Sequence, residues 1–197
     1  MDKFLSIPVN KILESEIVEK KSRFLAFAKY VSSSEDAEMF YREMRKKYND
    51  ARHIVFGYRL LNVSRANDDK EPSGTAGKPI LDVITKMNLY NVIVVVVRYF
   101  GGVKLGAGPL LRAYSNSASE VLKPPFCEFQ QALKVKTEVG FSEFENLLKL
   151  ATKNEIFLTD IEFSQKVSLT VIYPKDKEFN FEKLSEESIY YSFNEVM

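Results

Sequence analysis

Two glycine-rich loops contain most of the residues in this sequence that could bind a ligand or perform chemistry. Glycine loop 1, residues 68–79, reads Asp-Asp-Lys-Glu-Pro-Ser-Gly-Thr-Ala-Gly-Lys-Pro, and glycine loop 2, residues 98–109, reads Arg-Tyr-Phe-Gly-Gly-Val-Lys-Leu-Gly-Ala-Gly-Pro. Six of the 8 glycines of the chain lie in these loops. Glycine tolerates left-handed backbone and close approach of a ligand, so both loops are expected to make sharp turns or to contact a ligand.

Each loop ends in a proline, Pro79 or Pro109, of the kind that favours the first position of a helix. A helix N-terminus presents unpaired N–H groups and partial positive charge, which together favour an anion. We therefore predict one anion-binding surface built from both loops. Its members are Arg98, Lys104, Lys78, Arg112, Gly74, Gly77, Gly101, Gly102, Gly106, Gly108, Ser73 and Thr75. The alternative is that the glycines only make tight turns between strand and helix.

Neither loop fits a standard nucleotide-binding motif. A P-loop requires G-x-x-x-x-G-K followed by Ser or Thr, whereas Gly74 and Gly77 are too close together and Pro79 follows Lys78. The dinucleotide fingerprint G-x-G-x-x-G does not fit residues 106–111 either. We therefore disfavour a nucleotide-dependent enzyme of either kind and expect no cofactor.

Three acids, Asp68, Asp69 and Glu71, lie within four residues of loop 1, and His53 is the single histidine of the chain. Carboxylates of this density could hold a hard metal ion. Ser73, His53 and Asp69 could also form a catalytic triad. Acids in a polar loop more commonly cap turns, and a lone histidine on a strand is more commonly structural. We therefore expect no metal and no catalysis, and keep a metal-dependent hydrolase or phosphotransfer enzyme as the alternative.

Composition indicates a folded protein of the cytoplasm. The chain has 197 residues, of which 45% are hydrophobic and 28% charged. Its longest apolar run, residues 92–97, is too short to cross a bilayer, which takes about 20 residues in a helix. The first residues lack the pattern of a signal peptide. Cys127 is the single cysteine, which excludes an intrachain disulfide. We expect no membrane partner.

Charge divides the chain into two parts. Residues 1–130 contain 20 Lys and Arg against 15 Asp and Glu, whereas residues 131–197 contain 8 against 12. A basic part joined to an acidic part suggests two modules with different surfaces. We predict domains at residues 1–130 and 131–197, joined by a linker within 123–131.

Hydrophobic periodicity predicts an α+β fold in both parts. In the first part we expect two strands within 12–31, a helix after a cap at Ser33, a strand at 52–61, a loop at 62–76, a helix at 79–88, a strand at 91–99 covered on both faces, and a helix at 109–122. In the second part we expect strands at 133–139, 155–163, 166–173 and 189–193 and helices at 141–151 and 179–184. This βαββαβ order is that of a ferredoxin-like domain.

These motifs closely resemble the signature of the YigZ/IMPACT family. The resemblance lies in residues 68–80, 97–108 and 112–114. Residues 52–53 and 58–59 are similar to the strand that precedes these motifs in the family. In total the resemblance covers about residues 1–125. There are three departures. Lys70 and Pro109 replace residues that are more often glycine, and Ile54-Val55 replaces the more usual Asn-Cys, which argues against thiol or amide chemistry there.

The resemblance implies an N-terminal domain like the second domain of ribosomal protein S5, and a ferredoxin-like C-terminal domain similar to one in elongation factor G. Such domains touch RNA or the ribosome, and the eukaryotic relatives regulate translation through protein contacts. We therefore expect a translation-associated regulator that binds RNA or the ribosome through both loops, with His53, Tyr99 and Phe100 as candidates for stacking on bases. A purely protein-binding regulator is a further alternative.

Overall fold

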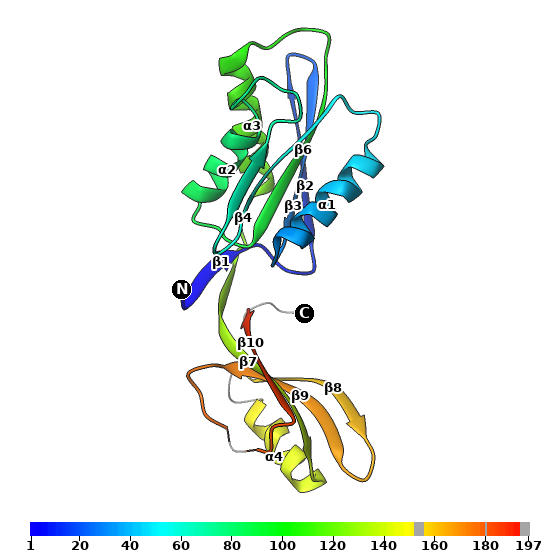
Figure 1. Cartoon of the computed structure of the whole chain (residues 1–197), viewed down its shortest axis with the longest axis vertical. Helices are drawn as coiled ribbons and strands as arrows, with labels where there is room; N and C mark the ends of the chain where they lie inside the picture. Colours follow the sequence, from blue (N-terminus) through cyan, green and yellow to red (C-terminus); the bar gives the residue numbers. More distant parts are fainter. Residues whose placement is uncertain (152–155, 180, 194–197) are drawn as a thin grey trace. The chain divides into compact units, whose positions relative to one another are not determined.

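The structure, a computed structural model, describes residues 1–151, 156–179 and 181–193 (Figure 1). It divides into two compact units. The N-terminal unit is Leu5–Cys127, and the C-terminal unit joins Met1–Phe4 to Glu128–Met197. The first four residues therefore belong with the second unit, which the predicted domains of residues 1–130 and 131–197 did not anticipate.

The N-terminal unit is built on one antiparallel sheet with the strand order β2-β3-β6-β4-β5. Its strands are β2 Ile12–Glu19, β3 Ser22–Tyr30, β4 His53–Arg59, β5 Ser64–Asn67 and β6 Val92–Tyr99. Strand β6 lies in the middle, and its first seven residues are all buried. The expectation that both faces of this strand are covered is confirmed.

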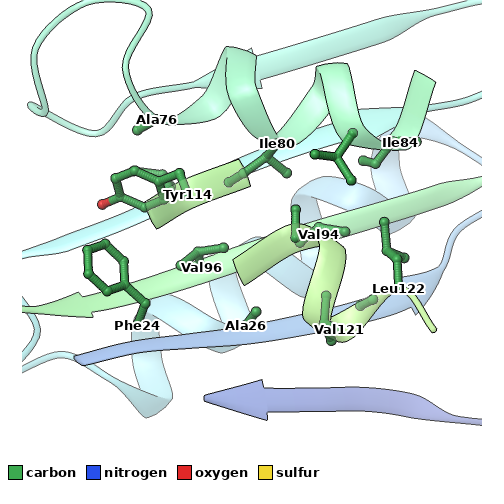
Figure 2. Packing of buried hydrophobic residues seen from close by; sticks show 14 of the residues in the cluster. Phe24, Ala26, Ala76, Ile80, Ile84, Val94, Val96, Tyr114, Val121 and Leu122 are labelled. Atoms are coloured by element: carbon green, nitrogen blue, oxygen red, sulfur yellow. The ribbon is translucent and has the colours of Figure 1, made fainter. Parts of the chain in front are cut away.

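Helices cover the two faces of this sheet in different numbers (Figure 1). Helix α1, Ser34–Lys47, packs on one face, where Phe40 and Met44 meet Ile54 and Val95. Helices α2, Gly77–Lys86, and α3, Ala107–Val121, pack on the other face. Figure 2 shows this second core, in which Ile80 and Tyr114 lie over Val94, Val96 and Phe24.

The capping residue of α1 is also confirmed. The Ser33 hydroxyl accepts a hydrogen bond from the Asp36 backbone N–H at 3.1 Å. The Asp36 carboxylate in turn accepts one from the Ser33 N–H at 3.2 Å. This reciprocal pair is a capping box, which satisfies two N–H groups that the helix itself cannot.

Three details of the N-terminal unit differ from prediction. Strand β5 lies inside the predicted loop 62–76. Helices α2 and α3 begin two residues before Pro79 and Pro109, which therefore occupy the third helical position rather than the first. A proline is tolerated there because no N–H in the first turn has an intrahelical partner. The helical pattern of residues 109–122 predicts Leu111 among the buried apolar side chains, but it is 42% exposed.

The C-terminal unit is a second antiparallel sheet covered by one helix. Its elements are β7 Cys127–Val139, α4 Phe141–Ala151, β8 Phe157–Phe163, β9 Val167–Pro174 and β10 Ser185–Tyr191. The strand order is β10-β7-β9-β8, and β1, Lys3–Ser6, also joins β7. Phe144 and Leu147 of α4 pack on Val135, Val171 and Tyr173 in its core.

The C-terminal unit also corrects the prediction in two places. The proposed linker is largely strand, because β7 begins at Cys127. The described positions within 179–184 are not helical. Instead, Phe179 and Phe181 pack their rings against Tyr173 at 4.9 and 6.1 Å. Glu155, placed at the start of a strand, lies outside the described residues. Within the described parts of both units, no helix has the length and apolar character needed to cross a membrane.

Candidate functional site at the two glycine loops

A buried ion pair brings the two glycine loops together. The Arg98 Nη1 atom, at the end of β6, lies 2.6 Å from Glu71 Oε1 in loop 1, and the side chains are only 7% and 4% exposed. The Tyr114 hydroxyl of α3 donates to the same oxygen at 2.8 Å. Glu71 therefore links loop 1 to the strand that precedes loop 2 and to the helix that follows it. Burial, and then the nearby Glu71 charge, raise the pKa of Tyr114, so its phenol stays protonated and donates.

Arg98 belongs to the interior of the protein, which corrects its predicted role as a phosphate contact. Its guanidinium carbon lies 5.4 Å from the ring centre of Phe24 and 5.8 Å from that of Phe100. Its Nε atom is buried and has no hydrogen-bond partner among the described residues. Because Glu71 already neutralises this cation, we assign Arg98 the role of holding the loops rather than a ligand.

The N-terminus of α2 is occupied by a carboxylate of the chain itself. Asp68 accepts backbone hydrogen bonds from Gly74 at 2.8 Å, Ala76 at 3.1 Å and Gly77 at 2.8 Å. These are the N–H groups that the sequence pattern offered to an external anion. In loop 1 these N–H groups are therefore already paired with Asp68 of the chain itself.

Asp69 and His53 are likewise held in structural hydrogen bonds. The Asp69 carboxylate accepts from the Ile54 N–H at 2.8 Å and pairs with Arg45 at 3.1 Å. The His53 Nδ1 atom lies 2.8 Å from the Asp69 carbonyl oxygen, which can only accept, so Nδ1 carries the hydrogen. Because His53 meets the carbonyl rather than the carboxylate, and Ser73 is exposed, the triad is not assembled. The described residues contain no group of three or more His, Cys, Asp or Glu that could hold a metal.

The other predicted members of loop 1 divide between interior and surface. A Cβ atom added to Gly77 would lie 2.6 Å from the Asn67 backbone nitrogen, so this glycine is required for packing. Thr75 is buried and its hydroxyl donates to the Pro72 carbonyl at 2.6 Å. Ser73 and Lys78 are exposed, and Gly74 is half-buried. Lys78, like Lys70, is therefore a cation of loop 1 that a ligand could reach.

Loop 2 leads into a helix whose N-terminus is open. Helix α3 follows Gly106, which has a φ of 83°, and no side chain in the described part of the chain caps it. Gly106, Gly108, Lys104 and Arg112 are all exposed. A Cβ added to Gly108 would lie 3.7 Å from Arg112 Nη1, so the guanidinium reaches the first turn of the helix. The N-terminus of α3 therefore keeps the features from which an anion site is predicted, and that site stays a prediction.

Loop 2 rests on the turn between β2 and β3, at the same end of the sheet (Figure 1). The Gly101 N–H donates to the Ser22 hydroxyl at 3.1 Å. Gly102, with a φ of 86°, is exposed. We call this surface the loop-2 tip; its exposed residues are Lys20, Lys21, Phe100, Val103, Lys104, Leu111 and Arg112.

Sequence reasoning missed four members of the loop-2 tip. Lys20 and Lys21 were interpreted only as a polar turn, and the sequence carries no signal that this turn supports loop 2. Leu111 was predicted to be buried and Val103 was given no role, because an exposed apolar side chain cannot be told from a buried one by residue type alone.

Comparison with known proteins identifies the family. The Impact N-terminal domain matches residues 20–122, a range that contains both glycine loops. The chain belongs to the IMPACT family. The IMPACT family member YvyE of Bacillus subtilis (strain 168) is 36% identical over 171 residues, 85% of this chain and 78% of that protein. The Protein IMPACT homolog of Saccharomyces cerevisiae is 31% identical over 116 residues, 56% of this chain and 45% of that protein.

A solved structure shares the fold over most of this chain. A crystal structure of a hypothetical protein matches with a TM-score of 0.64 and 26% identity, covering 88% of this chain and 86% of that one. The recognition of the family from the glycine loops is thus confirmed, as is a mixed α+β fold.

Proposed function

We propose that this IMPACT-family protein is a cytoplasmic, translation-associated regulator that binds RNA or the ribosome through the loop-2 tip. The observation that carries the proposal is the difference between the two helix N-termini. That of α2 is filled by Asp68, whereas that of α3 is uncapped among the described residues and lies beside exposed Lys104 and Arg112. The proposal therefore places the ligand at loop 2 alone, with Lys78 at its margin.

The chemistry of this surface suits a phosphate. Backbone N–H groups at a helix N-terminus and the two cations all favour a phosphate oxygen, and they do so without reading a base. Binding of this kind depends on counterion release and weakens as salt is raised. The translation link comes from the resemblance to eukaryotic family members that regulate translation.

We extend the proposal to the fold family of each unit. The order β10-β7-β9-β8 in the C-terminal unit agrees with a ferredoxin-like domain, although the second helix of that pattern is not present in the described residues. We propose that the N-terminal unit corresponds to the second domain of ribosomal protein S5. Both relationships would connect the chain to ribosome-binding proteins.

The test is RNA affinity as a function of salt for the full chain and for Lys104→Glu. If Lys104 contacts a phosphate, the variant binds less tightly and its log–log salt slope falls by about 0.7 for a single strand. The matched control is Lys86→Glu, because Lys86 is equally exposed but lies in the last turn of α2. The proposal fails if Lys104→Glu and Lys86→Glu have the same affinity and slope.

The exposed apolar side chains of the loop-2 tip favour one alternative, a regulator that binds only protein. Phe100, Val103 and Leu111 are 42%, 47% and 42% exposed, and exposed apolar residues also mark protein interfaces. A partner whose capture survives nuclease treatment and is lost in Leu111→Asp would support it. The hydrolase alternative has no comparable support, because Asp68, Asp69 and Glu71 are all engaged in structural hydrogen bonds.

A further inference from the structure

The Phe100 ring is supported from the inside of the protein and open to the outside. Arg98 lies over this ring, with its guanidinium carbon 5.8 Å from the ring centre. Arg98 is itself fixed by its ion pair to Glu71, and its side chain is 7% exposed. Phe100 nevertheless leaves 42% of its surface in solvent. The geometry is that of a flat aromatic surface held in place before any ligand arrives.

The other two candidates for stacking do not share this arrangement. Tyr99 also has a guanidinium over its ring, that of Arg23 at 5.9 Å, but Arg23 is itself exposed and does not support the ring from the interior. Tyr99 is half-buried, and its hydroxyl donates to Asp50 at 2.9 Å. His53 is half-buried, and its Nδ1 atom is committed to the Asp69 carbonyl. Of the three predicted residues, the structure therefore leaves Phe100 as the one suited to stacking.

The loop-2 tip also contains exposed apolar residues that are followed directly in the sequence by exposed cations. Val103 and Leu111 are exposed apolar residues, and each is followed directly by an exposed cation, Lys104 or Arg112. A duplex offers a protein mainly phosphates and sugars, since its bases are stacked inside, whereas an unpaired strand offers base faces as well. Aromatic rings beside cations are the common means of binding single strands.

We propose that the loop-2 tip selects unpaired RNA over duplex RNA, with one base stacked on Phe100 and the neighbouring phosphates held by Lys104 and Arg112. The inference rests on the proposed function and specifies the class of RNA. Glu71 and Arg98 act as positioning residues, because they hold the ring without touching the ligand.

The experiment compares two RNA probes by fluorescence anisotropy with the full chain: an oligouridine of about 10 nucleotides and a duplex of the same length. The chain should bind the oligouridine more tightly. Phe100→Ala should weaken oligouridine binding about 5- to 150-fold, the effect of losing one stacked base, without changing the salt slope. It should leave duplex binding unchanged. Phe100→Leu keeps an apolar side chain but removes the flat face, and it should weaken oligouridine binding nearly as much.

Met39→Ala is the matched control, because Met39 is an exposed apolar residue, 56% exposed, on α1 at the other face of the sheet. It should bind both probes as the unaltered chain does. Equal affinity for the two probes overturns the inference, as does an oligouridine affinity that Phe100→Leu leaves unchanged. If binding in these cases still depends on salt and on Lys104, the proposed function stands although the inference fails. Absence of salt-dependent binding to either probe overturns both.

Discussion

Glu71 and Arg98 form an ion pair of 2.6 Å in the interior of the N-terminal unit. The two residues come from different glycine loops, and Tyr114 adds a third connection, from α3 to the same carboxylate oxygen. The charges of Glu71 and Arg98 are thus turned inward, where they fix the geometry of the loops. The N-terminus of α3 and the exposed side chains of the loop-2 tip face the solvent.

Glu71→Gln should destabilise the N-terminal unit strongly. The substitution keeps the shape of the side chain but leaves the buried Arg98 charge without a counterion, which costs about 3–5 kcal/mol of unfolding free energy. Urea unfolding monitored by circular dichroism measures the effect. The matched control is Glu120→Gln, which breaks the exposed pair of Glu120 with Lys123 and should cost less than about 1 kcal/mol.

The double variant Glu71→Gln with Arg98→Met tests whether the unpaired Arg98 charge causes the loss of stability. Because it removes the uncompensated charge as well, it should recover part of the stability lost in Glu71→Gln. If the double variant is less stable than the single one by the full effect of Arg98→Met alone, the two residues are not coupled and the interpretation is wrong.

Asp68→Ala should convert the N-terminus of α2 into a site for external anions. Removal of the carboxylate leaves the N–H groups of Gly74 and Gly77 without their acceptor, at a cost of about 0.5–2 kcal/mol. Phosphate ions should then stabilise the variant more than the unaltered chain, because they can occupy the vacated position. Thermal unfolding over a phosphate series, with chloride at matched ionic strength, measures this.

Equal responses of the two chains to phosphate would show that the vacated N-terminus does not bind anions. Asp68→Asn provides the control for loss of charge alone, since its amide oxygen can still accept from the same N–H groups. It should be more stable than Asp68→Ala.

Local sequence patterns were sufficient to predict β6 and the start of α1. The seven buried residues of β6 and the capping residue Ser33 both carry their signal locally. Strand β5 was missed because Ser64-Arg65-Ala66-Asn67 is polar and is a strand only through pairing with β4. A helix was predicted within 179–184 from its apolar residues, but Phe179 and Phe181 instead make single aromatic contacts with Tyr173.

The anion site at the two loops stays a prediction, and the structure shows contacts within the loops that the sequence did not indicate. Glycines and cations locate an anion site, yet residue type alone does not say which anion fills it. Asp68 lies six to nine residues before the N–H groups it caps, which is beyond the usual capping distance. Arg98 was taken for a surface cation because its counterion, Glu71, lies 27 residues away in the sequence.

Asp36→Asn should destabilise the chain at neutral pH and much less in acid. Hydrogen bonds from Ser32, and then from Ser33, lower the pKa of Asp36 below its usual value of 3.8. The carboxylate therefore contributes stability above that value, and the contribution is lost as pH falls through the lower pKa of the folded state. Unfolding free energies of the two chains should differ by about 1 kcal/mol at neutral pH and converge in acid. If the difference in unfolding free energy between the two chains does not change with pH, the charge of the Asp36 carboxylate is not its cause.

Gly101→Ala and Gly102→Ala, neighbours in loop 2, should behave differently. A Cβ at Gly101 would lie 2.0 Å from the Lys21 carbonyl carbon, so loop 2 must lift from the β2–β3 turn. Gly102 has a φ of 86° and none of the described atoms lies within 4 Å of its Cβ position, so alanine there costs only about 1–2 kcal/mol of backbone strain.

Oligouridine affinity, measured where both variants are folded, separates the two effects. Gly101→Ala moves Phe100 relative to Arg98 and should weaken binding, whereas Gly102→Ala leaves that support intact and should bind more nearly as the unaltered chain does. If both variants bind alike, contact with the turn does not position Phe100, and the ion pair of Arg98 with Glu71 is sufficient to hold the ring.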